Sequence, residues 1–245
     1  MKLYGYWRSS CSWRVRIALE LKGLPWQDVP VHLVKQGGEQ HLAEYSAKNP
    51  MQQVPFLELD AAEELPSGLK LHGIAQSLAI MEYLDELYPE PPLLGRSAGE
   101  RARVRWLSEM INSGIQPLQN LLVMQEVERL APTHSKQWSA QFIARGLAAL
   151  ERSVSTERSV STERSVSPQR SVSTERGVSP QSGAFLVGDA PSMADICLIP
   201  QLYNARRFKV DVADYPRLHA VEAACLKLDA FLSTHPDQQP DAVPD

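Results

Sequence analysis

The chain has 245 residues, of which 43% are hydrophobic and 22% charged, and its formal net charge is -4 at pH 7. This composition is that of an ordinary globular protein with enough apolar residues for one large or two ordinary domains. The acidic balance gives no electrostatic reason to bind nucleic acid or an anionic membrane, so we expect neither partner. No apolar run approaches the ~20 residues that span a bilayer, and we expect no signal peptide at the start.

The chain contains three cysteines, Cys11, Cys197 and Cys225. An odd number of cysteines without metal-like spacing predicts unpaired thiols and no bound metal. Unpaired thiols are typical of a reducing compartment, so we expect a cytoplasmic protein. Cys197 and Cys225 fall on apolar helix faces and are expected to be inert core thiols.

The first 88 residues alternate between strand-like and helix-like patterns. Strands are predicted over 3–7, 26–33, 54–59 and 69–71, and helices over 11–22, 39–48 and 77–88. An acidic loop at 60–68 separates the last two strands. This order of elements predicts an α/β domain with one mixed sheet at residues 1–88.

A proline-rich linker is predicted at 89–98, because consecutive prolines cannot continue a helix. Residues 99–235 then form a predicted all-helical domain, with helices over 100–130, 135–151, 193–205 and 216–231. Pro117 lies inside the first helix and predicts a bend near Ser113 and Gly114. The last residues, 236–245, hold several prolines and are expected to form a flexible tail.

One segment, at 151–181, repeats a hexapeptide of the form ERSVST. Each unit offers one valine, which cannot offset a cost of roughly 1–2 kcal/mol per residue for ordering the backbone. We therefore predict a mobile, low-complexity surface loop. A β-solenoid is the alternative, but it requires a larger apolar face in each turn.

The leading candidate site lies where the first strand meets the first helix. Ser9, Ser10 and Cys11 stand at the start of that helix. A helix N-terminus carries partial positive charge and open N–H groups, so it stabilises a thiolate, whether that of Cys11 or of a bound thiol. Helix capping explains one serine but not the whole group. Position 14 is Arg, so the Cys-x-x-Cys pair of a dithiol redox couple is missing.

Two further patterns in the same domain allow both a structural and a functional interpretation. Val54-Pro55 is either an ordinary edge-strand proline or a cis bond that turns the backbone groups of Val54 toward a ligand. Gln76-Ser77 opens a helix, where Ser77 either caps the helix or helps its open N–H groups hold a carboxylate. The residues alone favour neither reading of the first pattern and favour capping for the second.

In the helical domain, Gln116 and Asn120 stand four residues apart on one predicted helix. They form either a solvated polar stripe or a pair of amides directed at a ligand. Ser192 and Asp195 have the spacing of a capping box before an apolar run, which predicts the start of a core helix.

Together these residues resemble the zeta class of glutathione transferases, the maleylacetoacetate isomerases. The string SSCSWRVR at 9–16 carries most of the resemblance. The supporting strings are NPMQQVP at 49–55, QSLAI at 76–80, GIQPLQN at 114–120 and RFKV at 207–210. The chain departs from the family pattern in a longer segment at 61–73 and in the hexapeptide insert.

The resemblance implies a thioredoxin-like N-terminal domain, a helical C-terminal domain, and a homodimer with glutathione bound between the domains. Ser9 would hydrogen-bond the glutathione sulfur and favour its thiolate, with Ser10 and Cys11 beside it. Val54 would pair with the cysteinyl backbone of glutathione. The other implied glutathione contacts are Ser12, Trp13, Arg14, Gln40, Gln76, Ser77, Gln116 and Asn120, of which Gln76 and Ser77 would hold the γ-glutamyl carboxylate.

The resemblance also implies the reaction. A glutathione thiolate adds reversibly to the cis double bond of maleylacetoacetate, the adduct rotates, and loss of the thiolate gives fumarylacetoacetate, in the breakdown of tyrosine and phenylalanine. Arg8 and Arg207 would bind the two carboxylate ends of the substrate. The alternatives are a maleylpyruvate isomerase, a glutathione transferase acting on small haloacids, and a transferase-like binding module without catalysis.

Overall fold

The computed structural model describes residues 1–163 and 183–243. Its sheet has four strands in the order β2-β1-β3-β4. These strands are β1 (Lys2–Gly5), β2 (Gln27–Pro30), β3 (Phe56–Glu64) and β4 (Lys70–Ala75). β1 runs parallel to β2, whereas β3 is antiparallel to both of its neighbours. This mixed sheet is the one predicted from the alternation of strand and helix patterns.

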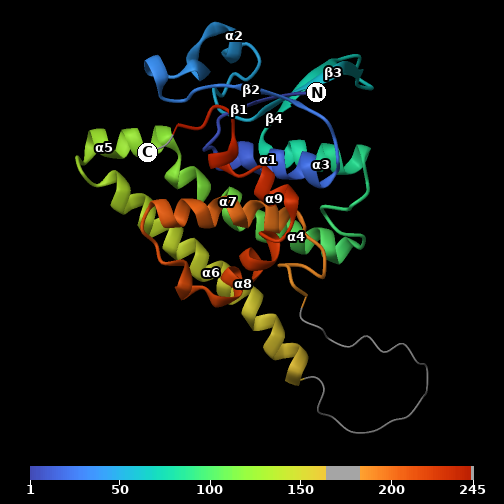
Figure 1. Ribbon diagram of the computed structural model, residues 1–245, viewed down its shortest axis with the longest axis vertical. Helices are drawn as coiled ribbons and strands as arrows, with labels where there is room; N and C mark the ends of the chain where they lie inside the picture. The colour runs from blue at the N-terminus through green and yellow to red at the C-terminus, as the bar shows by residue number, and fades with distance from the viewer. Residues whose placement is uncertain (164–182, 244–245) are drawn as a thin grey trace.

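Two helices cover one face of the sheet and face the helical domain, as Figure 1 shows. They are α1 (Ser10–Leu21) and α3 (Ser77–Leu87). Between β2 and β3 lie the short turns η1 (Lys35–Gly37) and η2 (Glu39–His41) and the one-turn helix α2 (Ala43–Ser46). The single helix predicted at 39–48 is therefore wrong, because the extended backbone of Leu42 separates η2 from α2.

The hairpin of β3 and β4 is longer than predicted. The acidic loop expected at 60–68 is largely strand, with a register irregularity between Glu58 and Glu63. Asp and Glu are poor strand formers, so β-propensity alone predicts a loop where the structure continues the strand. Residues that are distant in sequence hold the hairpin in place. Tyr83 donates a hydrogen bond to Glu63 at 2.9 Å, and the N-terminal ammonium pairs with Asp60 at 2.5 Å.

The rest of the described chain is helical. It contains α4 (Ala98–Asn112), η3 (Gln116–Gln119), α5 (Leu121–Leu130), α6 (Ser135–Glu163), α7 (Met193–Arg207), η4 (Val212–Asp214), α8 (Pro216–Cys225), α9 (Asp229–Ser233) and η5 (Pro236–Gln238). Within residues 1–163 and 183–243, no helix is both long enough and apolar enough to cross a bilayer.

Two long predicted helices are each broken into shorter elements. The helix expected at 100–130 stops at Asn112 and restarts at Leu121, so the chain is interrupted rather than bent. Pro117 stands at the start of the intervening η3, where its missing N–H costs no helical hydrogen bond. The helix expected at 216–231 likewise ends at Cys225 and resumes in α9.

Helix α6 extends into the hexapeptide segment. The loop predicted at 151–181 is therefore wrong for 151–163, which is helical, and the remainder at 164–182 lies outside the described residues. Val154 is buried against the helical core, so the first repeat does contribute apolar contact. Figure 1 shows this end of α6 projecting from the body of the molecule.

The capping box at the start of α7 is present as predicted. The Asp195 carboxylate accepts hydrogen bonds from the N–H and hydroxyl of Ser192, at 2.9 and 2.7 Å. Its other oxygen accepts the N–H of Leu186 at 2.8 Å. Asp195 is fully buried, and this burial raises the pKa of its carboxyl group. The hydrogen bonds thus satisfy a buried carboxylate and fix the direction of the central helix.

A single hydrophobic core joins the two halves of the molecule. Trp13 and Ile17 from α1 and Met81 from α3 pack with buried side chains of α4, α6, α7 and α8. The opposite side of α1 packs on the sheet through Val15 and Leu19. Helix α1 is therefore buried on two sides, and it presents its N-terminus at the edge of this junction.

Candidate functional site

Three chain segments meet at one end of the sheet. Phe56 at the start of β3 pairs with Tyr4 near the end of β1 and with Ala75 at the end of β4. This register brings Val54-Pro55 and Gln76-Ser77 beside the connection from β1 to α1. The sheet therefore gathers three of the segments that the sequence singled out.

The predicted thiol site lies at the N-terminus of α1. Ser9 is the N-cap residue, and its hydroxyl oxygen accepts the N–H of Ser12 at 3.2 Å. Ser9 is half-buried, and Cys11 is partly exposed and forms no disulfide. Ser10 is buried, with 8% of its surface exposed. Because the Ser9 oxygen accepts the capping bond, its own hydrogen remains available to an external anion.

The N-terminus of α3 is open within the described structure. Gln76 occupies the N-cap position with a φ of 73°, and no side chain caps the helix. Ser77 is buried, and its hydroxyl accepts a hydrogen bond from Arg14 at 3.2 Å. The capping role considered for Ser77 is therefore wrong. The first N–H groups of α3 are left for an anion such as a carboxylate.

The segment before β3 is held in place by its own side chains. The Val54–Pro55 bond is cis, which is one of the two alternatives that the sequence left open. The carbonyl of Gln53 accepts hydrogen bonds from the Tyr45 hydroxyl at 2.6 Å and from the Asn49 amide at 2.7 Å. Among the described residues, the backbone N–H and C=O of Val54 pair with no other backbone group.

Gln40 lies in η2, in the connection that leaves the same end of the sheet after β2. Its amide nitrogen donates to the Leu33 carbonyl at 3.3 Å and lies 3.0 Å from the His41 ring. The side chain is buried, and its Oε1 atom has no hydrogen-bond partner among the described residues. A buried acceptor without a partner is suited to an N–H donor from a ligand.

Three predicted ligand contacts face the protein interior instead. Ser12 accepts the N–H of Tyr6 at 3.3 Å, and Trp13 donates to Thr234 at 3.1 Å. Arg14 donates to Ser77 and to Asn112 of α4, the latter at 2.9 Å. All three side chains are almost fully buried. These successive positions of α1 are enclosed by the sheet on one side and the helical core on the other, and their contact with a ligand stays a prediction.

The polar pair in the helical domain is also placed differently. Gln116 begins η3, whereas Asn120 is the N-cap of α5 and accepts the N–H of Leu122 at 3.1 Å. The shared helix face predicted for these two residues does not exist, because the helix is interrupted between them. Their neighbour Gln119, which the sequence analysis did not single out, is buried and pairs with Gln201 at 2.7 Å.

The two predicted anion anchors, Arg8 and Arg207, both act on the titration of Tyr203. Burial and Asp237 raise the pKa of Tyr203, while Arg207 and Arg8 act in the opposite direction, so both guanidinium groups lie near this phenol. Arg8 stacks on Trp7, 4.8 Å from the ring centroid, and Arg207 is exposed at the end of α7. Sequence reasoning missed Tyr203, although its spacing of four residues before Arg207 places both on one helix face.

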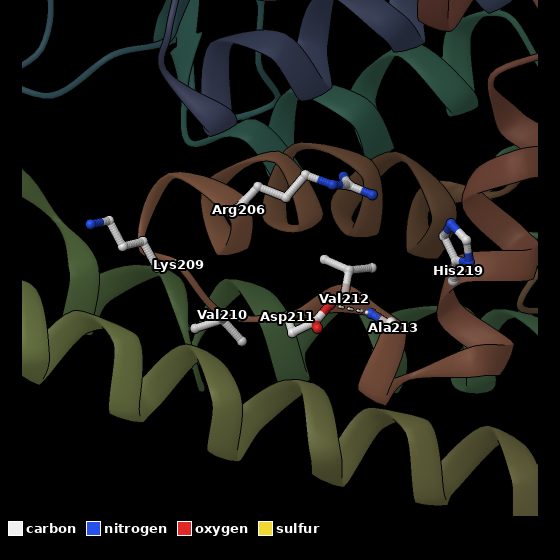
Figure 2. Close-up of a pocket in the computed structure, with 7 residues that line it drawn as sticks. All are labelled: Arg206, Lys209, Val210, Asp211, Val212, Ala213 and His219. Atoms are coloured by element: carbon white, nitrogen blue, oxygen red, sulfur yellow. Dashed lines mark hydrogen bonds between the residues drawn. The ribbon is translucent and has the colours of Figure 1, made fainter.

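The helical domain contains a surface pocket of about 420 Å³, and Figure 2 shows the side chains that line it. It lies where the end of α7 meets η4 and α8. Its lining residues are Arg206, Lys209, Val210, Asp211, Val212, Ala213 and His219, none of which belongs to the predicted site. Arg206 is already paired with Glu222 through two hydrogen bonds of 2.6 Å. The candidate functional site considered below is the group of residues at the end of the sheet.

Comparison with known proteins assigns both halves of the chain. Residues 3–92 match the glutathione S-transferase N-terminal domain, and residues 136–224 match the glutathione S-transferase C-terminal domain. The maleylacetoacetate isomerase of Mus musculus is 43% identical over 98% of this chain and 94% of its own length. The structure of a bacterial maleyl pyruvate isomerase in the zeta class, in its holo form, has a TM-score of 0.82 at 36% identity and covers 99% of this chain and 100% of its own.

This chain belongs to the zeta class of glutathione S-transferases. The structure of a maleylacetoacetate isomerase from Anaeromyxobacter dehalogenans is 43% identical with a TM-score of 0.78, over 99% of this chain and 94% of its own. It was crystallised with dicarboxyethyl glutathione and citrate in the active site. The family and the thioredoxin-like plus helical fold that the sequence implied are thereby confirmed. The zeta-class signature string at 9–16 coincides with the buried helix α1 and the cap at its start.

Proposed function

We propose that this chain is a glutathione-dependent isomerase that converts maleylacetoacetate into fumarylacetoacetate. One observation carries the proposal: the sheet register brings the partly exposed Ser9 and Cys11 to the same end of the sheet as Val54 and the uncapped N-terminus of α3. This is an arrangement for a ligand that has a thiol, a peptide backbone and a carboxylate. Glutathione is such a ligand, and relatives of this family bind it or a derivative of it.

The residues at the end of the sheet fit glutathione one group at a time. The open N–H groups of α3 suit the γ-glutamyl carboxylate, because the helix dipole favours an anion there. The backbone groups of Val54, which pair with no other backbone group in the described part of the chain, suit the cysteinyl peptide unit. Bound at this position, glutathione would supply a thiolate that adds reversibly to the cis double bond of the substrate.

The chain's own residues have distinct roles in this proposal. Ser9 donates its hydroxyl hydrogen to the sulfur and so favours the thiolate, with the positive end of α1 adding to the effect. Arg8 and Arg207 bind the substrate carboxylates, since guanidinium groups pair with carboxylates in a bidentate geometry. The same cations oppose the negative charge that develops on the keto oxygen next to the double bond.

We further propose that the enzyme is a cytoplasmic homodimer that binds no nucleic acid. The thiols of Cys11, Cys197 and Cys225 form no disulfide, in keeping with a reducing compartment. The net charge of -4 offers no general attraction to a nucleic-acid backbone. Analytical ultracentrifugation at micromolar concentration tests the dimer directly.

A second candidate function is maleylpyruvate isomerisation. It is supported by the fold similarity to a maleyl pyruvate isomerase. The chemistry is the same, but the substrate is shorter, so its carboxylates would need more closely spaced anchors. Dechlorination of small haloacids is a third possibility. Turnover of maleylacetoacetate, maleylpyruvate and dichloroacetate by the purified chain with glutathione ranks the three, and we expect the highest kcat/KM for maleylacetoacetate.

The role of Ser9 is tested by comparing Ser9→Ala with Cys11→Ala. We expect Ser9→Ala to lose most of the isomerase activity, because glutathione brings its own thiol and needs a donor. Cys11→Ala should retain a substantial part. Ser9→Thr is the matched control, because it keeps both the hydroxyl and the helix cap. The reverse ranking would show that the protein thiol performs the chemistry. A protein without turnover or retention on glutathione resin would instead be a binding module.

A further inference from the structure

The C-terminal segment returns to the N-terminal domain beside the functional site. A flexible tail was expected at 236–245, yet the carboxylate of Asp241 accepts the backbone N–H of Trp7 at 3.2 Å. In Figure 1 the red end of the chain runs back toward the sheet and α1. A contact between residues 234 positions apart cannot be read from local sequence.

The other side of the Trp7 residue is held by Arg16. The guanidinium of Arg16 donates to the Trp7 carbonyl at 2.8 Å, and its side chain is 1% exposed. Burial lowers the pKa of Arg16 to about 10, and the carboxylates of Asp28 and Asp241 oppose that shift. The buried Arg16 and the half-buried Asp28 and Asp241 therefore form one group of interacting charges. Both backbone groups of Trp7 are hydrogen-bonded to members of it.

The path of the tail to Asp241 is fixed at several points. Thr234 accepts the indole N–H of Trp13 at 3.1 Å. The His235 ring packs edge-on against Trp13 and Tyr203, with centroids 5.1 and 5.5 Å apart. Asp237 accepts the hydroxyl of Tyr203 at 3.3 Å. The tail is thus attached to α1 and α7 before it reaches the connection from β1 to α1.

We propose that Asp241 and Arg16 are positioning residues that clamp the Trp7 backbone and thereby set the placement of Arg8 and Ser9. The inference rests on the proposed function, which gives those two neighbours their roles toward the substrate carboxylate and the sulfur. Only four residues connect Gly5 to Ser10, so a displacement at Trp7 is passed on to Arg8 and Ser9. A misplacement of about 1 Å in a reacting group can reduce the rate by about two orders of magnitude.

The clamp predicts that its loss impairs turnover of the dicarboxylate substrate more than it impairs glutathione binding. Asp241→Ala removes the acceptor for Trp7, whereas the α3 end of the site is held separately by Arg14 and Ser77. We expect kcat/KM for the dicarboxylate substrate to fall about ten-fold, while glutathione affinity falls less than about three-fold. General loss of structure would reduce both together. Asp241→Asn, which keeps an acceptor oxygen but removes the charge beside Arg16, should lie between wild type and Asp241→Ala.

A direct readout comes from hydrogen–deuterium exchange of the full-length protein. The peptide that contains Trp7, Arg8 and Ser9 should exchange several-fold faster in Asp241→Ala, with the peptide of α3 unchanged. A chain ending at Pro240 should behave like Asp241→Ala. A chain ending at residue 243, which keeps Asp241, is the matched control and should behave like wild type.

The outcomes separate this inference from the proposed function. Unchanged exchange at Trp7 together with unchanged kcat/KM in Asp241→Ala would overturn the clamp, whatever the wild type catalyses. The clamp would also be overturned if the chain ending at residue 243 showed the same increase in exchange at Trp7 as the chain ending at Pro240. If the wild type had no isomerase activity but Asp241→Ala still exchanged faster at Trp7, the clamp on the backbone would be supported and the proposed function would be rejected.

Discussion

The buried guanidinium of Arg14 shows how one residue can serve the site without touching a ligand. Arg14 is fully buried, and among the described residues its hydrogen-bond acceptors are the neutral oxygens of Ser77 and Asn112. Its Nε and Nη2 atoms have no hydrogen-bond partner among the described residues. A buried cation with incomplete partners contributes little to stability and can reduce it. Its position is better explained by what it holds, namely the first residue of α3.

We therefore predict that Arg14→Met weakens glutathione binding more than it weakens the fold. Loss of the bond to Ser77 should reduce glutathione affinity by about ten-fold, or about 1.4 kcal/mol. The free energy of unfolding should change by less than about 1 kcal/mol, because an apolar side chain of similar length replaces an incompletely paired charge. Isothermal calorimetry and urea unfolding give the two quantities.

Asn112→Ala is the control for this prediction. It removes the partner of Arg14 in α4 but keeps the bond to Ser77. Its effect on glutathione affinity should be clearly smaller than that of Arg14→Met. If both variants weakened binding equally, the contact between the two domains, rather than the placement of α3, would be the quantity that Arg14 controls.

At the scale of elements, the first hexapeptide repeat lies in α6 and makes contacts with the rest of the helical domain. Glu151 accepts the N–H groups of Arg217 and Leu218, both at 3.0 Å, and so satisfies the start of α8. The carbonyl of Ser153 accepts a hydrogen bond from Arg103 at 3.0 Å, and Val154 is 7% exposed. The first repeat therefore belongs to the folded helical domain, although its sequence matches the units that follow.

Two deletions are predicted to behave differently. Removal of residues 157–181 should leave kcat/KM within about two-fold of wild type, because it spares these contacts. Removal of residues 151–181 should lower the free energy of unfolding by about 2–3 kcal/mol, from a lost helix cap and a lost buried valine. Thermal unfolding and isomerase assays of both chains check this. A large loss of activity in the shorter deletion would mean that the repeat reaches the site.

Local sequence patterns predict those features of the elements that depend on interactions between residues close together in the chain. The order of strands and helices follows from hydrophobic period, and the capping box at Ser192 and Asp195 follows from short-range hydrogen bonds. The break near Pro117 was predicted as a bend, because a proline inside a helix permits either outcome. The second half of the β3–β4 hairpin was missed, since its acidic residues are held by Tyr83 and the distant N-terminus.

At the scale of the whole molecule, the sequence predicts two domains but not their shared core. From the residues alone, only the adjacent Ser9, Ser10 and Cys11 indicated a ligand site, whereas Val54 and Ser77 were assigned to it through the family resemblance, and these assignments stay predictions. The surroundings of residues that depend on long-range packing could not be predicted from the sequence, as Trp13 and Tyr203 illustrate. Trp13 carries the same apolar signal whether it lines a ligand site or a domain junction. Only the packing of α1 against α7 and the C-terminal segment distinguishes the two.

The shared core predicts that the two domains unfold together. Trp13, Ile17 and Met81 are at most 2% exposed and pack against the helical domain. Exposing each would cost about 1.5–3 kcal/mol, so the sum rivals the about 5–15 kcal/mol by which a typical domain is stable. Residues 1–92 alone should therefore lack cooperative thermal unfolding, and the full chain should show one calorimetric transition. If the chain is a dimer, that transition should move to higher temperature with protein concentration. Two resolved transitions, or a folded 1–92 fragment, would show that the helical domain is not needed to bury α1 and α3.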